Sequence, residues 1–489
     1  MQNRTLYYLP RDIAFRIVIF AASTGMFFVY LNAFRNETLI AKDSLSYINF
    51  SPDRPIGYPI FLSIIGLFDK SYALAFPVQL ALLCGSSALL AIAIASFLDS
   101  YVAGTLLLGM LLANKVMLRL SASIMSDPLA CILLTLFTAF SISYVRSARL
   151  QNACIKTFFV GWSIACRPIN IVFPLSDLLI VLLGNTKIRT RLKHAVIALA
   201  FALISLMITP LFHLFYSASV ATSPLARGLF QKAIFDAPVD KSAYARCVDE
   251  ATFSAIEASK DYIARAPESF RPVLVAKMSD YVRFQIVIPA LNRAGRPVDQ
   301  SLMCFAMDAM KKYGFTILRD DLADYIRLAT YSPRINSNDA VSYINYITQN
   351  SPSAYLKNHS GSELPYFEAS SLQDDFYPEP EFGGATRTAA RLLIGLSNLV
   401  PLIAVIVVLF VRRPDVRFLL LISVAFGLPA NIALAATAMI EFPLSRYVMV
   451  YLPLLLTALI CAAWAAFSCL PKAIRPHPFK IPTQRTSSN

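Results

Sequence analysis

Apolar runs long enough to cross a lipid bilayer recur along this chain and constrain its fold more than any other feature. A helix needs about 20 residues to cross roughly 30 Å of hydrocarbon. Runs of that kind are found at 13–33, 74–98, 101–118, 128–145, 195–217, 391–411, 418–440 and 447–469. The composition agrees, because 56% of the residues are apolar and only 15% are charged. The sequence therefore predicts an all-α polytopic membrane protein, with the first run retained as a span rather than cleaved as a signal peptide.

The segments between the apolar runs differ in charge. Segments 1–11, 146–156, 184–194, 412–417 and 471–489 each carry two to four Lys or Arg, and Asp415 is the one acid among them. By the positive-inside rule these segments and both termini are cytoplasmic. The stretch 157–183 lies between two such segments and contains Arg167-Pro168, so it should leave and return as two short or re-entrant helices. The total is then about ten membrane passes.

This distribution also accounts for the net charge of +14. Basic residues gather where anionic inner-leaflet lipids lie, without the aromatic interleaving of nucleic-acid binding proteins. The expected location is the inner (plasma) membrane, and nucleic acid is not an expected partner. Segment 471–489 is expected to be a disordered, basic cytoplasmic tail.

The one large hydrophilic insertion, residues 219–388, contains both signs of charge in near balance. Its apolar residues recur at three- and four-residue spacing, which predicts a mainly helical extracytoplasmic domain, periplasmic or extracellular. The predicted division is 1–218 for the first transmembrane module with its outer loop, 219–388 for this domain, 389–470 for the last transmembrane helices and 471–489 for the tail. Cys247 and Cys304 lie in the domain, either bridged or as two buried free thiols.

A polar segment, DSLSYINFSPDRPIGYP at 43–59, follows the first span and is expected to face outward. It leads into IGYPIFLSIIGLF, an apolar piece too short for a comfortable crossing, which fits a helix at the interface. A carboxylate held where membrane meets water can accept a proton from the hydroxyl of a lipid-associated substrate. For any single acid, an ordinary solvated loop residue is the competing interpretation.

Five motifs occur in order along the chain: Asp43 with Tyr47, RPIGYPIFL at 54–62, MSDPLACILL at 125–134, ACRPINIVFPL at 165–175 and SRYVMVYLPLL at 445–455. Together they resemble the GT-C superfamily of integral-membrane glycosyltransferases, especially the branch of protein O-mannosyltransferases and the lipid A aminoarabinose transferase. The resemblance implies a GT-C-like helical bundle. It also implies an inverting transfer of a sugar from a polyprenyl-phosphate donor to a lipid, glycan or protein acceptor at the outer face of the bilayer.

The resemblance assigns catalytic roles to two acids. Asp43 is expected to act as base or to position the acceptor, and Asp127 opens a later span. Ser126-Asp127-Pro128 is equally compatible with a plain helix start, in which an acid or hydroxyl caps a helix beginning at proline. The chain has no paired acid beside Asp43, whereas relatives that use a divalent metal generally need more than one carboxylate near the donor phosphate. Asp53 is the alternative second ligand, but a divalent metal is not favoured and no cofactor is predicted.

Without a metal, cations must neutralise the leaving phosphate, and guanidinium suits this because it binds phosphate at two points. The candidate substrate-binding residues are the cations near predicted span ends, the buried arginine of the 157–183 stretch and the motif tyrosines: Tyr47, Arg54, Tyr58, Arg167, Arg227, Lys232, Arg446 and Tyr447. Interfacial snorkelling is the competing interpretation for the span-end cations.

Two other classes of protein fit parts of the pattern. An O-antigen ligase or polymerase-like enzyme also combines many spans with a large outer loop, but its chemistry is expected to use Arg and His in that loop, where only His359 is present. A non-enzymatic lipid or glycan transporter needs a polar path across the membrane centre, whereas the polar residues here gather at one face.

Overall fold

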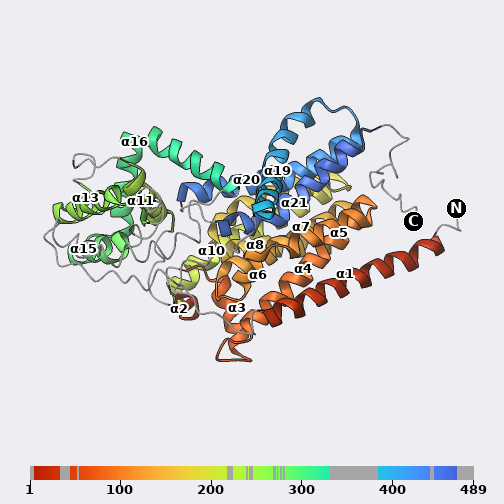
Figure 1. Cartoon of the computed structure of the whole chain (residues 1–489), viewed down its shortest axis with the longest axis horizontal. Coiled ribbons are helices and arrows are strands. Elements are labelled where there is room, and N and C mark those ends of the chain that lie inside the picture. Colours follow the sequence, from red (N-terminus) through yellow and green to blue (C-terminus); the bar gives the residue numbers. More distant parts are fainter. Residues whose placement is uncertain are drawn as a thin grey trace. The chain divides into compact units, whose positions relative to one another are not determined.

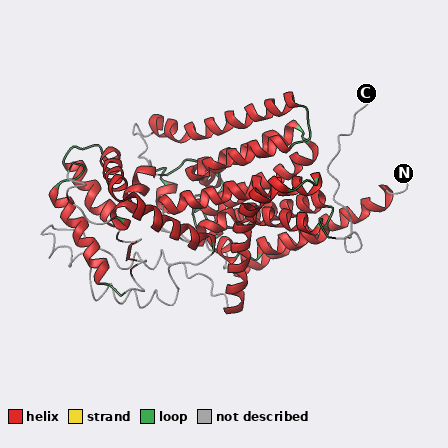
Figure 2. Ribbon diagram, turned by 90° about the horizontal axis from the view of Figure 1, so that it is seen from above, coloured by secondary structure: helices red, strands yellow, loops and turns green. Residues whose placement is uncertain are grey.

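The structure is a computed structural model, and every regular element in the residues it describes is a helix (Figure 2). The described residues are 5–33, 44–51, 54–216, 224–237, 241, 246–267, 271, 274–275, 278, 281–330, 384–440 and 445–470. Asp43, His359 and the expected tail 471–489 lie outside them. The chain forms two compact units. The first comprises Met1–Ser219, Ala389–Ala433 and Arg446–Asn489, and the second comprises Val220–Thr388 and Leu434–Ser445.

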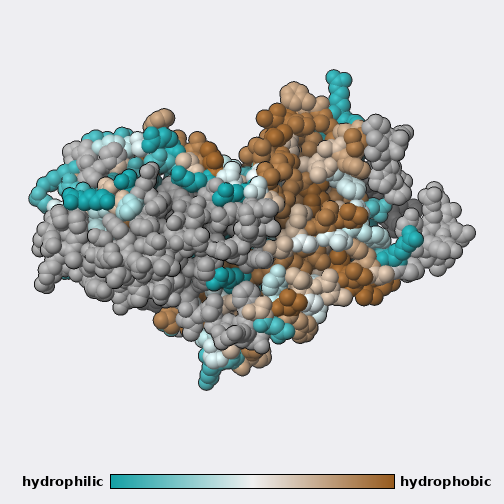
Figure 3. Space-filling model, viewed as in Figure 1, coloured by the Kyte–Doolittle hydropathy of each residue, from teal (hydrophilic) through white to brown (hydrophobic). Residues whose placement is uncertain are grey.

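The first unit contains most of the long apolar helices (Figures 1 and 3). Its elements are α1 (Thr5–Ala33), α2 (Ser44–Ile48), α3 (Gly57–Gly66), α4 (Ala75–Leu98), α5 (Tyr101–Leu112), α6 (Lys115–Ser121), α7 (Ser126–Ser147), α8 (Leu150–Cys166), η2 (Pro168–Val172), α9 (Phe173–Leu183), α10 (Ile188–Tyr216), α19 (Gly384–Phe410), α20 (Pro414–Ile440) and α21 (Ser445–Phe467). Three of these helices extend into the second unit, which contains the start of α19 up to Thr388, the end of α20 from Leu434 and the first residue of α21, Ser445.

Seven helices of the described part are long and apolar enough to cross a membrane: α1, α4, α7, α10, α19, α20 and α21. The apolar composition of these helices, together with the all-helical architecture, confirms a multi-pass all-α membrane protein. Helix α7 is almost wholly buried and packs against both α4 and α8 (Figure 1). Helices α1 and α10 instead expose long apolar faces, as lipid-facing helices do.

Two apolar stretches are interrupted, and the residues at the breaks explain why. Helix α8 ends at Cys166, Arg167 is extended, and Pro168 opens the 3₁₀ helix η2. Proline disfavours the helical conformation in the residue before it, so the expected break at Arg167-Pro168 is confirmed. The run 101–118, expected as a single span, is also not one continuous helix. It divides into α5 and α6 because the Asn114 side chain accepts a hydrogen bond from Met117 N and caps α6.

The sequence placed Lys156 in a cytoplasmic loop, segment 146–156. In the structure it is a helix residue instead. It lies in the second turn of α8, fully buried, and forms an ion pair with Asp177 of α9. Thr157 Oγ1 donates a hydrogen bond of 2.8 Å to the same carboxylate. The loop between α7 and α8 is correspondingly short, and this buried pair joins α8 to α9.

The second unit is built from α11 (Pro224–Asp236), α13 (Glu250–Arg265), the π-helix η3 (Val282–Val287), α15 (Ile288–Arg293) and α16 (Val298–Ala329). Phe230 of α11 and Phe305 of α16 meet edge to face in its core, with ring centroids 5.0 Å apart. Asp249 caps α13 by accepting a hydrogen bond from Thr252 N. The unit therefore has an apolar core of its own, separate from the apolar membrane helices.

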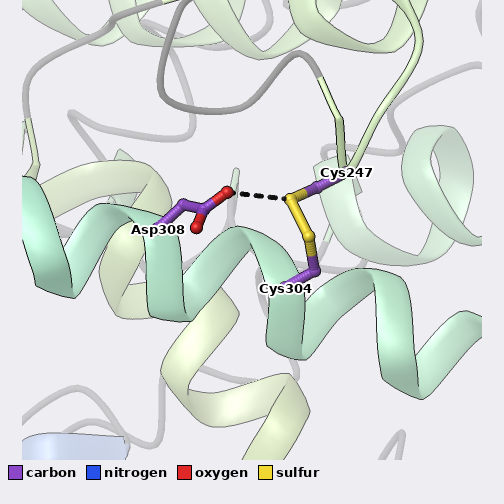
Figure 4. A group of neighbouring side chains, drawn as sticks. All are labelled: Cys247, Cys304 and Asp308. Atoms are coloured by element: carbon purple, nitrogen blue, oxygen red, sulfur yellow. Dashed lines mark hydrogen bonds between the residues drawn. A yellow bond between two sulfur atoms is a disulfide. The ribbon is translucent and has the colours of Figure 1, made fainter.

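A disulfide joins Cys247 to Cys304 of α16 (Figure 4). Asp308 Oδ2 lies 3.3 Å from Cys247 Sγ, and Asp308 also pairs with Arg246, whose hydrogen bond holds the pKa of that carboxyl below its usual value. Two cysteines and an aspartate at this spacing are also a possible metal-ligand group. The sulfur atoms are bonded to each other, however, and are not thiolates that bind a metal.

Peptide mapping of the protein without reduction should recover a linked pair of peptides containing Cys247 and Cys304. The bridge joins positions 57 residues apart, so it also restrains the unfolded chain of the second unit. The control is Cys469, an exposed free cysteine, which should be alkylated under the same conditions. Alkylation of Cys247 and Cys304 without prior reduction would contradict the bridge.

Candidate functional site

Asp127 lies in the first turn of α7 and is 4% exposed. Its Oδ1 forms an ion pair with Arg167 Nη1, and its Oδ2 lies 4.0 Å from Arg446 Nε. The residue preceding α7 is Met125, which makes no side-chain capping hydrogen bond. The carboxylate therefore does more than start a helix, since it joins α7 to the α8 break and to α21.

Both arginines also contact one aromatic ring. The guanidinium carbons of Arg167 and Arg446 lie 5.0 and 5.2 Å from the centroid of the buried Tyr447 ring. Arg446 Nη2 donates a hydrogen bond of 3.3 Å to the Tyr447 hydroxyl. Cation–π contacts at this distance favour a fixed guanidinium orientation. Asp127, Arg167, Arg446 and Tyr447 are called the Asp127 cluster below, and its two cations outnumber its one anion.

The helix break positions Arg167 for this role. Because Arg167 is extended between α8 and η2, its side chain leaves the chain at a point where no regular helix continues. Asn170 in η2 donates a side-chain hydrogen bond to Ser163 O and accepts one from Tyr451 of α21. These bonds satisfy backbone and side-chain groups that the break would otherwise leave unpaired inside an apolar bundle.

The first polar loop is attached to the residues just before the cluster. Ser44 Oγ donates a hydrogen bond of 3.1 Å to Ile124 O, and Tyr47 Oη lies 3.1 Å from Ser126 Oγ. Arg54 stacks over the Tyr47 ring, with its guanidinium carbon 4.8 Å from the centroid. Tyr47 is thus hydrogen-bonded to Ser126, the residue before Asp127, and Arg54 in turn contacts Tyr47. Asp43 lies outside the described residues and directly precedes Ser44 in the chain.

Tyr58 of α3 is not exposed to a substrate cavity but packs against this loop. It is fully buried, meets the Tyr47 ring edge to face at 5.1 Å, and donates a hydrogen bond of 3.2 Å to Gln79 Oε1. Gln79 Nε2 in turn donates to the carbonyls of Ser121 and Ser123. Sequence reasoning missed Gln79, although an amide within an otherwise apolar span was the signal that could have identified it.

Steric crowding explains why position 57 of the RPIGYP motif is a glycine. A Cβ there would lie 2.6 Å from the carbonyl carbon of Ala165 and 2.7 Å from Cys166 N. Trp162 Nε1 donates a hydrogen bond of 3.1 Å to Gly57 O. Only glycine lets α3 approach the end of α8 this closely, so this motif fixes α3 beside the break that carries Arg167.

An apolar groove of about 400 Å³ lies beside the loop, lined by Phe50, Ile60, Ser63, Ile64, Leu67 and Phe212. Phe50 and Phe212 form one wall, with ring centroids 5.6 Å apart. His213, next to Phe212, is buried and its Nε2 is within 3.0 Å of Arg54 O. Several groove side chains on α3 are exposed, Leu67 by 82%, so the groove is open along that helix.

The two remaining candidates belong to the second unit and are not part of the Asp127 cluster. Lys232 of α11 is buried, with its Nζ 2.7 Å from Asp324, 3.3 Å from Asp321 and 3.7 Å from Asp236. Burial raises the pKa of Asp321, against the opposing charge of Lys232. Arg227 lies in α11, and its side chain is outside the described part of the structure.

Comparison of the chain with protein-family models, with curated proteins and with solved structures finds no match. The resemblance to the GT-C superfamily therefore rests on the motifs of the chain itself. All five motifs contribute described residues to one connected set of contacts, made of Tyr47, Arg54, Tyr58, Ser126, Asp127, Arg167, Arg446 and Tyr447. Asp43, the other residue of the first motif, lies outside the described residues.

Proposed function

We propose that this chain is a GT-C-like inverting glycosyltransferase that uses a polyprenyl-phosphate sugar at the outer face of the membrane. The observation that carries the proposal is the convergence of Arg167 and Arg446 on Asp127 and Tyr447. Two guanidinium groups oriented on one carboxylate and one aromatic ring present paired N–H donors, which suit the oxygens of a phosphate. The apolar groove beside the first polar loop supports a lipid-linked donor.

The reaction is a single displacement. An acceptor hydroxyl oxygen attacks the anomeric carbon from the face opposite the phosphate, the bond from that carbon to the phosphate oxygen breaks, and polyprenyl phosphate leaves. Asp43 takes the proton from the acceptor hydroxyl. Arg167 and Arg446 stabilise the charge that develops on the departing phosphate. Asp127 contacts both arginines, so its role is to position them.

The proposal includes about ten membrane passes: the seven long spans, α5 from the run 101–118, and a pair of short membrane helices formed by α8 and by η2 with α9. Both termini are cytoplasmic and the second unit is periplasmic or extracellular. The acceptor is a lipid, a glycan or a protein.

A panel of radiolabelled donors tests the reaction. The purified protein is incubated with several polyprenyl-phosphate sugars and with polyprenyl-diphosphate-linked oligosaccharides, together with lipid, glycan and protein acceptors. One monophosphate donor should be consumed, releasing free polyprenyl phosphate, and Arg446→Met should abolish this. The matched control is Arg413→Met, which removes an arginine from an exposed ion pair with Asp415 and should leave turnover unchanged. Consumption of only diphosphate-linked donors would favour a ligase, and no consumption at all would favour a transporter.

A topology reporter tests the outer-face assignment separately. A reporter active only outside the cytoplasm, fused after residue 300, should be active, because 219–388 lacks the basic excess of the cytoplasmic segments. The same reporter fused after residue 470 is the control and should be silent. A cytoplasmic signal from the fusion at 300 would overturn the orientation and place the Asp127 cluster on the wrong face for a polyprenyl-phosphate sugar.

A further inference from the structure

The C-terminal half of α16 exposes four large apolar side chains and buries two acids. Phe315, Leu318, Leu322 and Ile326 are 84%, 59%, 56% and 51% exposed. Their spacing of three, four and four residues places them on one face of the helix, and they are called the α16 stripe. On the opposite face Asp321 and Asp324 are buried. This is the reverse of the pattern expected for a helix whose outer face meets water.

The rotation of this half of α16 is fixed by the ion pairs on its buried face. Lys232 Nζ of α11 lies 2.7 Å from Asp324 and 3.3 Å from Asp321. Arg327 adds a further contact of 2.8 Å to Asp324. Turning the stripe inward would leave the buried Lys232 without these carboxylates, which is strongly unfavourable. The stripe therefore stays on the surface of the second unit.

Exposed basic residues lie close to the stripe in sequence. Lys311 and Lys312 are exposed and precede the kink of α16 at Tyr313, and the side chains of Arg319 and Arg327 are 67% and 40% exposed. Asp320 is the partly exposed acid on this half of the helix, and it pairs with Arg319 at 3.0 Å. We propose that the α16 stripe docks on the surface of the bilayer, with its apolar side chains at the acyl boundary and its nearby cations among the lipid phosphate groups.

The connections of the second unit to the membrane helices make this docking possible. Helix α11 begins eight residues after α10 ends at Tyr216, so the chain that joins this unit to that span is short. Gly228 of α11 contacts Ile440, which ends α20 and belongs to the same unit, so closely that a Cβ would overlap it. Lys232 lies one turn further along α11 and forms the ion pairs with Asp321 and Asp324 on the half of α16 that carries the stripe.

Spin labelling of the full chain in a bilayer tests the proposal, which is independent of the transfer reaction. Cys154→Ser and Cys469→Ser remove the two free cysteines that are not buried, leaving the disulfide intact. Leu318→Cys and Leu322→Cys, in separate proteins, then carry the label on the stripe. The matched control is Glu257→Cys on α13, another exposed position of the second unit. The proteins are reconstituted in nanodiscs of phosphatidylcholine and phosphatidylglycerol.

Collision with oxygen, which concentrates in lipid, is compared with collision with a water-soluble nickel complex. The ratio of oxygen to nickel accessibility should be several-fold higher at Leu318→Cys and Leu322→Cys than at Glu257→Cys. Equal ratios at the three positions would mean that the stripe meets water and would overturn the proposal. Low accessibility to both reagents at the stripe would mean that protein covers it, from this chain or another, and would also overturn the proposal.

Discussion

Asp43→Asn should lower the rate of sugar transfer at least about a hundredfold, because loss of a general base typically lowers rates by about 10²–10⁴. Asparagine keeps the shape of the side chain but cannot accept the proton of the acceptor hydroxyl. Asp43 is bonded to Ser44, whose hydroxyl is hydrogen-bonded to Ile124 O, three residues before Asp127. The first described residue of the loop is therefore attached beside the proposed phosphate site, which is where a base for this displacement is needed.

The matched control is Asp53→Asn, which removes an acid from the same loop and should change the rate much less. Initial rates would be measured with the donor identified in the panel, and the amount of each variant in the membrane would be measured by fluorescence-detected size exclusion. Near-normal transfer by the Asp43 variant would remove it as the base. Equal losses in both variants would point to a general effect of loop charge instead.

Asp127→Asn should lower the stability of the protein by about 3 kcal/mol or more, because removing one partner of a buried ion pair leaves the other charge uncompensated. Here two guanidinium groups lose the same anion, and the Arg167 side chain is only 11% exposed. The apparent melting temperature of the detergent-solubilised protein measures the effect. Donor turnover should fall as well, since Arg167 and Arg446 lose the group that orients them.

Asp415→Asn provides the comparison for Asp127→Asn. Asp415 pairs with Arg413 at 2.6 Å, but the Arg413 side chain is 44% exposed, and solvent screens such pairs so that they contribute little. The melting temperature of this variant should stay close to that of the unchanged protein. If both variants melted at the same temperature, the Asp127 cluster would not be a stabilising junction of α7, α8 and α21.

Properties that depend on local sequence were predictable. The span helices follow from the length of apolar runs, and the break at Arg167 follows from the proline after it. The motif residues Tyr47, Arg167 and Arg446 were selected from the sequence, and they lie in one connected set of contacts. The topology predicted from the positive-inside rule placed these residues at the same end of the membrane helices.

Properties that depend on partners far apart in the chain were not predictable. Gln79 bonds to carbonyls more than 40 residues away, and no periodicity identifies such a partner. Lys232 was selected as a phosphate ligand because it follows a span, whereas its ammonium is buried against acids more than 80 residues later in the chain. A single basic residue near a span end does not reveal whether it faces a substrate, a lipid or an internal carboxylate.

The buried ion pair of Lys156 and Asp177 has a consequence for how α8 and α9 are inserted into the membrane. A lysine near the middle of a membrane helix costs about 2.5–3.5 kcal/mol on insertion scales, and α8 and α9 each carry one buried charge. Neither short helix is well suited to partition into lipid alone, but joined at Arg167-Pro168 they neutralise each other. We infer that they leave the translocon together as a hairpin. A nascent chain truncated after α8 should therefore leave that helix extractable from the membrane, whereas one truncated after α9 should retain both.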